Sequence, residues 1–141
     1  MHSPRILFVT PEFDDFVKVG GLAAVSAELP RALSHLCDIR VMVPGYRQVL
    51  SHSQGIRIVG HCGPLAGLPP CSVGRLNTSD GLAVYVVLCP TLYEREGFPY
   101  GDERGRDWDD NDARFARFAA AAADLAAGLV DPDWAADLVN V

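Results

Sequence analysis

Several features that would point to particular classes of protein are missing from this sequence of 141 residues. No apolar stretch approaches the roughly 20 residues that a membrane-spanning helix needs, and the first residues lack the long apolar region of a secretory signal. We therefore expect a cytoplasmic protein with no membrane partner. Acidic residues outnumber basic ones, giving a net charge of −6. This disfavours a broad nucleic-acid surface, because such surfaces are basic.

The sequence also offers little for binding metals or forming disulfides. Its four cysteines have no C-x-x-C spacing, and its four histidines are scattered, so we assign the histidines no chemistry. The acidic run 107–112 lacks the Gly and Glu that a calcium-binding EF-hand loop requires, so we predict a helix start there and no metal site. Each cysteine lies in or beside an apolar segment, which favours reduced core thiols. These are Cys37, Cys62, Cys71 and Cys89.

The chain begins with the pattern of a strand, a glycine-bearing loop and a helix. Residues 6–9 are apolar and bounded by prolines, which predicts a buried strand. Apolar residues then recur at spacings of three and four, which predicts a helix over 21–36 with this stripe on the core. We expect Pro30 to kink the helix near residues 27–30 without dividing it. The expected stripe is Leu22, Val25, Leu29, Leu33 and Leu36.

The loop between this strand and helix is a candidate phosphate site. A helix start presents backbone N–H groups without intrahelical acceptors, and such groups bind anions. Lys18 adds a mobile positive charge close to Gly20 and Gly21. The pattern fits neither the dinucleotide fingerprint nor the P-loop. A second interpretation therefore stays open, in which the glycines only permit a tight turn or close helix packing and Lys18 is solvated.

The remaining pattern predicts an α/β fold. A strand over 38–43 completes a strand–helix–strand unit, which implies a right-handed crossover and a parallel sheet. Short strands over 56–59 and 72–76 indicate a small antiparallel excursion. Residues 82–88 have the continuous apolar character of a central buried strand. A long loop and a helix over 111–129 follow.

Two loops, residues 11–21 and 90–107, leave predicted parallel strands at the edge where open α/β sheets bind ligands. The later helix, 111–129, starts with acidic residues near its positive end. Another strand begins at Asp137, so we interpret the chain as an amino-terminal piece of something larger. The expected buried stripe of the later helix is Phe115, Phe118, Ala122, Leu125 and Leu129.

Six segments, in this order and spacing, resemble the bacterial glycogen and starch synthases, which transfer glucose from ADP-glucose to α-1,4-glucan. They are RILFVTPE (5–12), FVKVGGLA (16–23), LPRAL (29–33), RVMVPGY (40–46), LYEREGFPYGD (92–102) and DWDDNDARFARF (107–118). The resemblance covers essentially the whole chain. It implies the amino-terminal half of a glycosyltransferase-B fold, truncated. Residues 1–141 would be a partial Rossmann-like domain, and the carboxy-terminal nucleotide-binding domain would be absent.

The resemblance also implies roles for individual residues. In the family, the lysine of the K-x-G-G-L loop contacts the donor diphosphate, which implies this role for Lys18, with the N–H groups around Gly20 and Gly21 beside it. The tyrosine of the L-Y-x-R-x-G-x-P-Y segment lines the sugar side of the cleft. This implies Tyr93, with Tyr100 as a second candidate. We place no catalytic residue in this chain, and expect transfer with retention and no metal or other cofactor.

One position departs from the family pattern. The family usually reads G-G-L-A-D, whereas Ala24 stands at the last position here, so a methyl group replaces a cleft carboxylate. A glucan-binding or regulatory module derived from a synthase therefore stays open. An unrelated Rossmann-like nucleotide binder also stays open, because motif matches can mislead. We expect the chain alone to have negligible transferase activity, because half a cleft cannot hold the reacting groups together.

Overall fold

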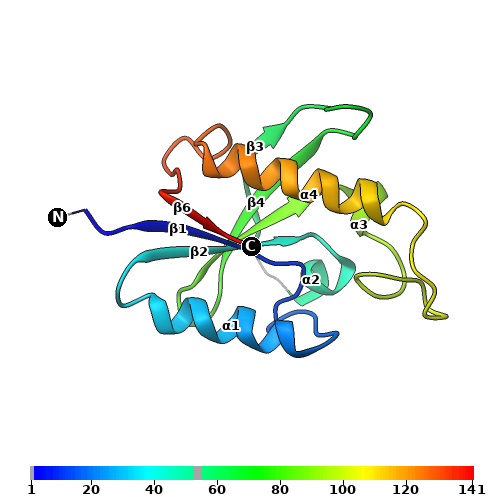
Figure 1. Ribbon diagram of the computed structural model, residues 1–141, viewed down its shortest axis with the longest axis horizontal. Coiled ribbons are helices and arrows are strands. Elements are labelled where there is room, and N and C mark those ends of the chain that lie inside the picture. The colour runs from blue at the N-terminus through cyan, green and yellow to red at the C-terminus, as the bar shows by residue number, and fades with distance from the viewer. Residues whose placement is uncertain (1, 53–54) are drawn as a thin grey trace.

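The computed structural model describes residues 2–52 and 55–141 and contains ten helices and strands within them. The strands are β1 (Arg5–Val9), β2 (Asp38–Pro44), β3 (Arg57–Cys62), β4 (Cys71–Asn77), β5 (Ala83–Leu88) and β6 (Leu138–Asn140). The helices are α1 (Gly21–Leu33), α2 (Arg47–His52), α3 (Pro90–Tyr93) and α4 (Asn111–Ala126). All the strands join one sheet in the order β3-β4-β5-β2-β1-β6. Helix α1 lies on one face of this sheet and α4 on the other (Figure 1).

The parallel part of the sheet agrees with the sequence pattern. Strand β1 pairs in parallel with β2 and β6, and β2 pairs in parallel with β5. Strand β5 is continuously apolar and β2 is apolar from Val41 to its end, as expected when helices cover both faces of a parallel sheet. Val41, Val43, Val84 and Val86 at their centres are fully buried. The predicted α/β class, the β1–α1–β2 unit and the central strand are therefore confirmed.

The antiparallel excursion is also confirmed. Strand β3 pairs antiparallel with β4, and β4 pairs antiparallel with β5. The strands are longer than predicted because their pairing extends into the flanking residues. At Gly60 in β3, an added Cβ would lie 2.2 Å from the carbonyl oxygen of Val130. Only glycine permits this close approach between β3 and the segment after α4.

The predicted buried face of α1 is wrong. The helix starts at Gly21 and runs through Pro30 without a break, as expected, but it ends at Leu33. Leu22, Val25 and Leu29 are 45%, 52% and 41% exposed, and Leu36 lies beyond the helix and is also exposed. Of the expected stripe, only Leu33 packs partly against the core. The residues that α1 buries are Ala23, Ser26, Ala27 and Pro30.

Helix α4 follows its predicted stripe except at the end. Phe118, Ala122 and Leu125 are buried and Phe115 packs against the core. Leu129 is exposed, because the helix ends at Ala126 and Gly128 turns the chain with a φ of +81°. The expectation that Leu129 is buried was therefore wrong.

Two further expectations concern cysteines and membranes. All four cysteines are free thiols; Cys37 is half-buried and the other three are buried, which confirms their interpretation as reduced core residues. No helix within residues 2–52 and 55–141 is long and apolar enough to cross a membrane.

Candidate functional site

The two predicted ligand loops meet at the carboxyl-terminal edge of the parallel strands. Glu12 lies three residues after the end of β1, and Tyr100 lies on the loop that follows α3. The Tyr100 hydroxyl donates a hydrogen bond of 2.7 Å to Oε2 of Glu12. Although 88 positions separate them in the sequence, these residues join the loops into one surface.

Glu12 also holds the loop that precedes α1. Its Oε1 accepts hydrogen bonds from the backbone N–H groups of Val19 and Gly20, each at 3.0 Å. The side chain is only 5% exposed, and this burial by itself favours the neutral acid. The hydrogen bonds from Tyr100, Gly20 and Val19 outweigh burial and hold the pKa of Glu12 below its ordinary value. An ionised carboxylate therefore lies beneath the glycine loop.

A small closed turn places Lys18 at the surface. Phe13 and Val17 form an antiparallel bridge, with backbone bonds of 3.2 Å and 2.8 Å in the two directions. Both side chains are buried, which fixes the turn to the core. Lys18 follows directly and is exposed, and it is the only lysine in the sequence. A single mobile ammonium thus lies beside the start of α1.

The helix start has open space above its glycines. Gly20 is the N-cap, has an extended backbone (φ −149°), and caps the helix with no side chain. A Cβ added at Gly20 or Gly21 would meet nothing within 4 Å. Neither a left-handed backbone nor a close neighbour therefore requires glycine at these two positions, although Gly inside a helix costs about 1 kcal/mol relative to Ala.

The first-turn amides differ in availability. The N–H of Gly20 is donated to Glu12, together with that of Val19. The N–H groups of Gly21, Leu22 and Ala23 belong to the first helical turn and have no intrahelical acceptor. Of the predicted pair, Gly21 therefore has the amide that remains available to an anion.

Tyr93 lies deeper than a residue that lines an open cleft. It is 1% exposed, its ring contacts Tyr46 edge-on at 6.2 Å, and its hydroxyl donates to the backbone carbonyl of Arg114 at 2.6 Å. Burial raises the pKa of Tyr93 above its ordinary value. The ring and hydroxyl are both used inside the chain, so its predicted role toward sugar stays a prediction.

Sequence reasoning missed Arg114, which organises the loop carrying Tyr100. Its Nε donates to the Leu92 carbonyl, and its Nη1 donates to the Pro99 carbonyl and to Oδ1 of Asn111, each at 2.7 Å. The side chain is almost completely buried, and burial lowers the pKa of Arg114. The available signal was an arginine on the same helical face as Phe118.

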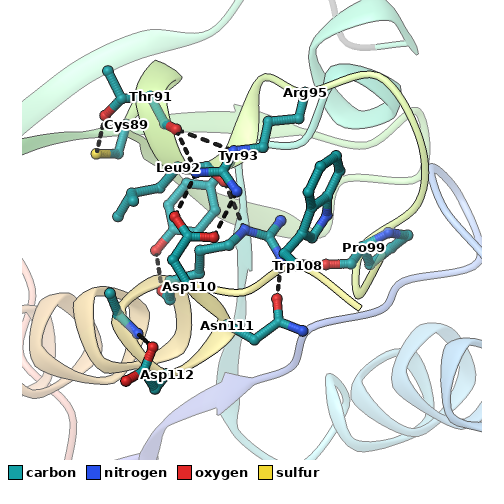
Figure 2. A network of polar contacts seen from close by, with 12 residues as sticks. Cys89, Thr91, Leu92, Tyr93, Arg95, Pro99, Trp108, Asp110, Asn111 and Asp112 are labelled. Atoms are coloured by element: carbon teal, nitrogen blue, oxygen red, sulfur yellow. Dashed lines mark hydrogen bonds and ion pairs between the residues drawn. The ribbon is translucent and has the colours of Figure 1, made fainter. Parts of the chain in front are cut away.

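A second guanidinium braces the same loop from outside. Arg95 donates to both carboxylate oxygens of Asp110, at 2.7 Å and 2.6 Å, and lies over the ring of Trp108 at 5.1 Å (Figure 2). The ion pair holds the pKa of Asp110 below its ordinary value despite partial burial. The loop from α3 to α4 is therefore fixed at both ends, which positions Tyr100 against Glu12.

Tyr46, from the predicted RVMVPGY segment, is also buried behind this edge. Its hydroxyl has no hydrogen-bond partner among the described residues. Burial, followed by the proximity of Tyr100, raises the pKa of Tyr46. The ring supports Tyr93 from the core side, so we assign it a packing role.

A hollow of about 520 Å³ opens at the opposite edge of the sheet, beside the starts of β2 and β5. Two of its cations already have carboxylate partners: Arg31 pairs with Asp15 and Asp80, and Arg40 pairs with Asp38. We assign this hollow no ligand. Across the described part of the chain, no three His, Cys, Asp or Glu residues are grouped so that they could hold a metal ion.

Comparison with known proteins gives the family to which this fold and site belong. A family model described as the starch synthase catalytic domain matches residues 5–141, and the chain belongs to this family. Among curated proteins, it is 63% identical over 127 residues to Glycogen synthase 1 of Bradyrhizobium diazoefficiens, a match that covers 90% of this chain and 28% of that protein. It is 57% identical over 139 residues to the glycogen synthase of Pseudomonas fluorescens, covering 99% and 27%. The chain thus spans little more than a quarter of the length of these relatives.

A solved structure supports the fold independently. The catalytic domain of Starch Synthase IV from Arabidopsis thaliana bound to ADP and acarbose aligns with a TM-score of 0.62 at 22% identity. The alignment covers 91% of this chain and 26% of that one. The predicted glycosyltransferase-B type of fold and the predicted family are therefore confirmed.

Proposed function

We propose that this chain forms the donor-diphosphate side of a retaining glucosyltransferase, which moves glucose from ADP-glucose to the non-reducing end of an α-1,4-glucan. Membership of the starch synthase catalytic domain family and the names of the relatives support this proposal. The ADP in the solved neighbour is consistent with a nucleotide-sugar donor. The observation that carries the proposal is the open helix start at Gly20 and Gly21 beside Lys18.

The proposed chemistry follows from where charge develops. As the bond between glucose C1 and the diphosphate oxygen breaks, negative charge grows on the departing ADP. Donors placed at that charge stabilise the transition state more than the ground state. The Lys18 ammonium and the free first-turn amides, beginning with Gly21, would supply this stabilisation, aided by the helix dipole. We therefore propose that the transfer needs no metal ion, and that chelation with EDTA leaves it unchanged.

The proposed roles of the two tyrosines differ. Tyr100 donates its hydroxyl to Glu12, so it would act on the donor loop through that carboxylate. Tyr93 would support the sugar side of the cleft from within the core, because its hydroxyl is bonded to a backbone carbonyl inside the chain. The carboxy-terminal nucleotide-binding domain and the cytoplasmic location expected from the sequence stay predictions.

A chimera tests the proposal. This chain replaces the matching segment of the Bradyrhizobium Glycogen synthase 1, to which it is 63% identical, and incorporation of labelled glucose from ADP-glucose into glycogen is measured. We expect turnover by the chimera and negligible turnover by the 141-residue chain alone, because it spans only 28% of that relative and part of a cleft cannot hold the reacting groups together. A chimera that melts like its parent and binds glucan, but neither binds ADP nor transfers glucose, would sink the proposal. That result would favour a glucan-binding module, and Ala24→Asp would be the first substitution to test for recovery of transfer.

Lys18→Ala tests the site itself. Loss of one donor to a developing oxyanion typically costs about 3–4 kcal/mol of barrier, so kcat of the chimera should fall about 10²-fold to 10³-fold with an unchanged melting temperature. Arg104→Ala, at an exposed cation on the other loop, is the matched control. Lys18 is the only lysine of the 141-residue chain, so reductive methylation of this chain by itself, outside the chimera, with labelled formaldehyde gives one side-chain NMR signal. ADP should shift that signal, and an unmoved signal in ADP-bound protein would remove Lys18 from the donor site.

A further inference from the structure

Glu12 is a buried anion held entirely by dipoles. Its three donors are the N–H groups of Val19 and Gly20 and the hydroxyl of Tyr100. Among the described residues, no lysine, arginine or histidine forms an ion pair with it. Hydrogen bonds to an ionised acceptor are about twice as strong as neutral ones. The charge on Glu12 therefore gives these three contacts more stability than a neutral side chain would.

Resting on the function proposed above, we propose that Glu12 is a positioning residue for glucosyl transfer. By accepting two consecutive N–H groups, it turns the backbone at Val19 and Gly20 inward. The next amides, from Gly21 onward, and the Lys18 ammonium are then left to face the donor diphosphate. Glu12 touches none of the reacting atoms and acts only through the loop that it orders.

The backbone of Glu12 is itself fixed to the core. The Thr10 hydroxyl donates to the carbonyl of Glu12 at 2.8 Å and accepts from its N–H at 3.3 Å. Thr10 is also bonded to the Ser26 hydroxyl of α1 at 2.8 Å, and both hydroxyl residues are buried. The backbone of Glu12 is thus held from the end of β1 and from α1, so a change at the carboxylate oxygens acts on the loop and leaves the Glu12 backbone in place.

The other carboxylate oxygen of Glu12, Oε2, connects the loop before α1 to α4 through Tyr100. The carbonyl of Tyr100 accepts hydrogen bonds from Nδ2 of Asn111 at 2.9 Å and from the N–H of Trp108 at 3.2 Å. Its ring packs on Phe115 at 5.9 Å. The start of α4 therefore fixes the position of the Tyr100 hydroxyl. The hydrogen bond from this hydroxyl to Glu12 links that position to the loop before α1. One carboxylate therefore contacts both loops of the proposed donor site.

The negative charge of Glu12 affects where the donor diphosphate can bind. A diphosphate and the Glu12 carboxylate repel each other, while Glu12 already occupies the amides of Val19 and Gly20. The donor is therefore directed to the following amides, nearer the helix axis. A neutral Gln at this position keeps the size of the side chain but weakens the order of the loop. We expect kcat to fall about tenfold to a hundredfold, since a misplacement of about 1 Å can cost 10²-fold in rate.

Amide hydrogen exchange tests the positioning in the 141-residue chain itself, without any assay of activity. We expect exchange at Val19 and Gly20 to be at least tenfold faster in Glu12→Ala than in the wild type, with β2 unchanged. Glu28→Ala, at an exposed glutamate of α1, is the matched control and should change neither amide. Unaltered exchange at both amides would overturn the proposal. If Glu12→Ala fails to fold, Glu12→Gln and Tyr100→Phe give the same test with smaller expected changes.

Kinetics of the chimera separate positioning from a merely structural role. In Glu12→Gln and Tyr100→Phe, we expect kcat to fall while the KM for glycogen stays constant and each variant is fully folded at the assay temperature. A lower melting temperature with wild-type kcat would overturn the proposal. If the unmutated chimera transfers no glucose, the function proposed above fails. The exchange experiment then decides by itself whether Glu12 orders the loop.

Discussion

Arg114 offers a direct test of what fixes the loop that carries Tyr100. Its guanidinium reaches two backbone carbonyls, of Leu92 and Pro99, from two different nitrogens, and a third acceptor on Asn111. None of these acceptors is charged. The substitution Arg114→Lys keeps the positive charge and its burial cost, but replaces a planar fork with a compact ammonium. The measured change therefore reports hydrogen-bond geometry more than electrostatics.

The expected size of the effect follows from the contacts that are lost. An ammonium placed for one carbonyl leaves at least one buried acceptor without a partner, which costs about 1–3 kcal/mol. The guanidinium also lies 5.8 Å from the ring of Trp108 and 5.6 Å from that of Phe115, and weaker stacking adds about 0.5–1 kcal/mol. We expect Arg114→Lys to lower the free energy of unfolding by about 1.5–4 kcal/mol.

Urea unfolding, followed by tryptophan fluorescence, measures this loss. The fluorescence comes from Trp108, which lies beside the substituted side chain, and from the buried Trp134, and it is compared with circular dichroism to confirm that both report one transition. Arg104→Lys, on the same loop but exposed, should change stability by less than about 0.5 kcal/mol. A loss at Arg114→Lys no larger than that of the control would refute the view that its fork holds the loop.

Three further predictions concern acid stability, thiol reactivity and the packing of α1. Since the folded pKa of Glu12 is lowered, its contribution to the free energy of unfolding is fully present above the ordinary pKa of 4.5 and is lost as pH falls through the folded pKa. Glu12→Gln should therefore reduce the loss of stability at acid pH, measured by urea titrations at several pH values. Burial raises the pKa of Cys71 to about 12 and also raises that of Cys62, so iodoacetamide at pH 8 should label both slowly until urea unfolds the chain, as mass spectrometry would show. Ala23→Leu should cost about 1–3 kcal/mol by overpacking, whereas Val25→Gln should change stability by less than about 0.5 kcal/mol; equal losses in thermal melts would contradict the observed orientation of α1.

The sheet was predictable because its strands carry their signal locally. Residues 38–43 alternate and then run apolar, residues 82–88 are an apolar run, and turn residues lie at their ends; both segments form strands in the structure. Burial on both faces of a parallel sheet makes such runs continuous. The parallel pairing then followed from the strand–helix–strand order. These parts of the fold depend on neighbours in sequence and so can be inferred from it.

The contacts that build the site have no such local signal. Glu12 and Tyr100 bond across 88 positions, and a carboxylate and a hydroxyl at that separation form no periodic pattern. Arg114 was missed for a different reason: arginine is among the residues least often fully buried. Its acceptors are mostly backbone carbonyls, which every residue possesses. Lys18 and the glycines could be proposed as a phosphate site because a helix start and a nearby cation are adjacent in sequence, and that role stays a prediction.

The orientation of α1 shows where periodicity stops being informative. A stripe at spacings of three and four identifies a helical face, but it does not say which face contacts the sheet. Here the small residues Ala23 and Ala27 lie inward with Ser26, whose hydroxyl bonds to Thr10 at the end of β1. That bond requires the helix to approach the strand closely, and larger side chains in place of the alanines would prevent it. The polar contact therefore fixes the inward face of α1, and Leu22, Val25 and Leu29 are turned outward as a consequence.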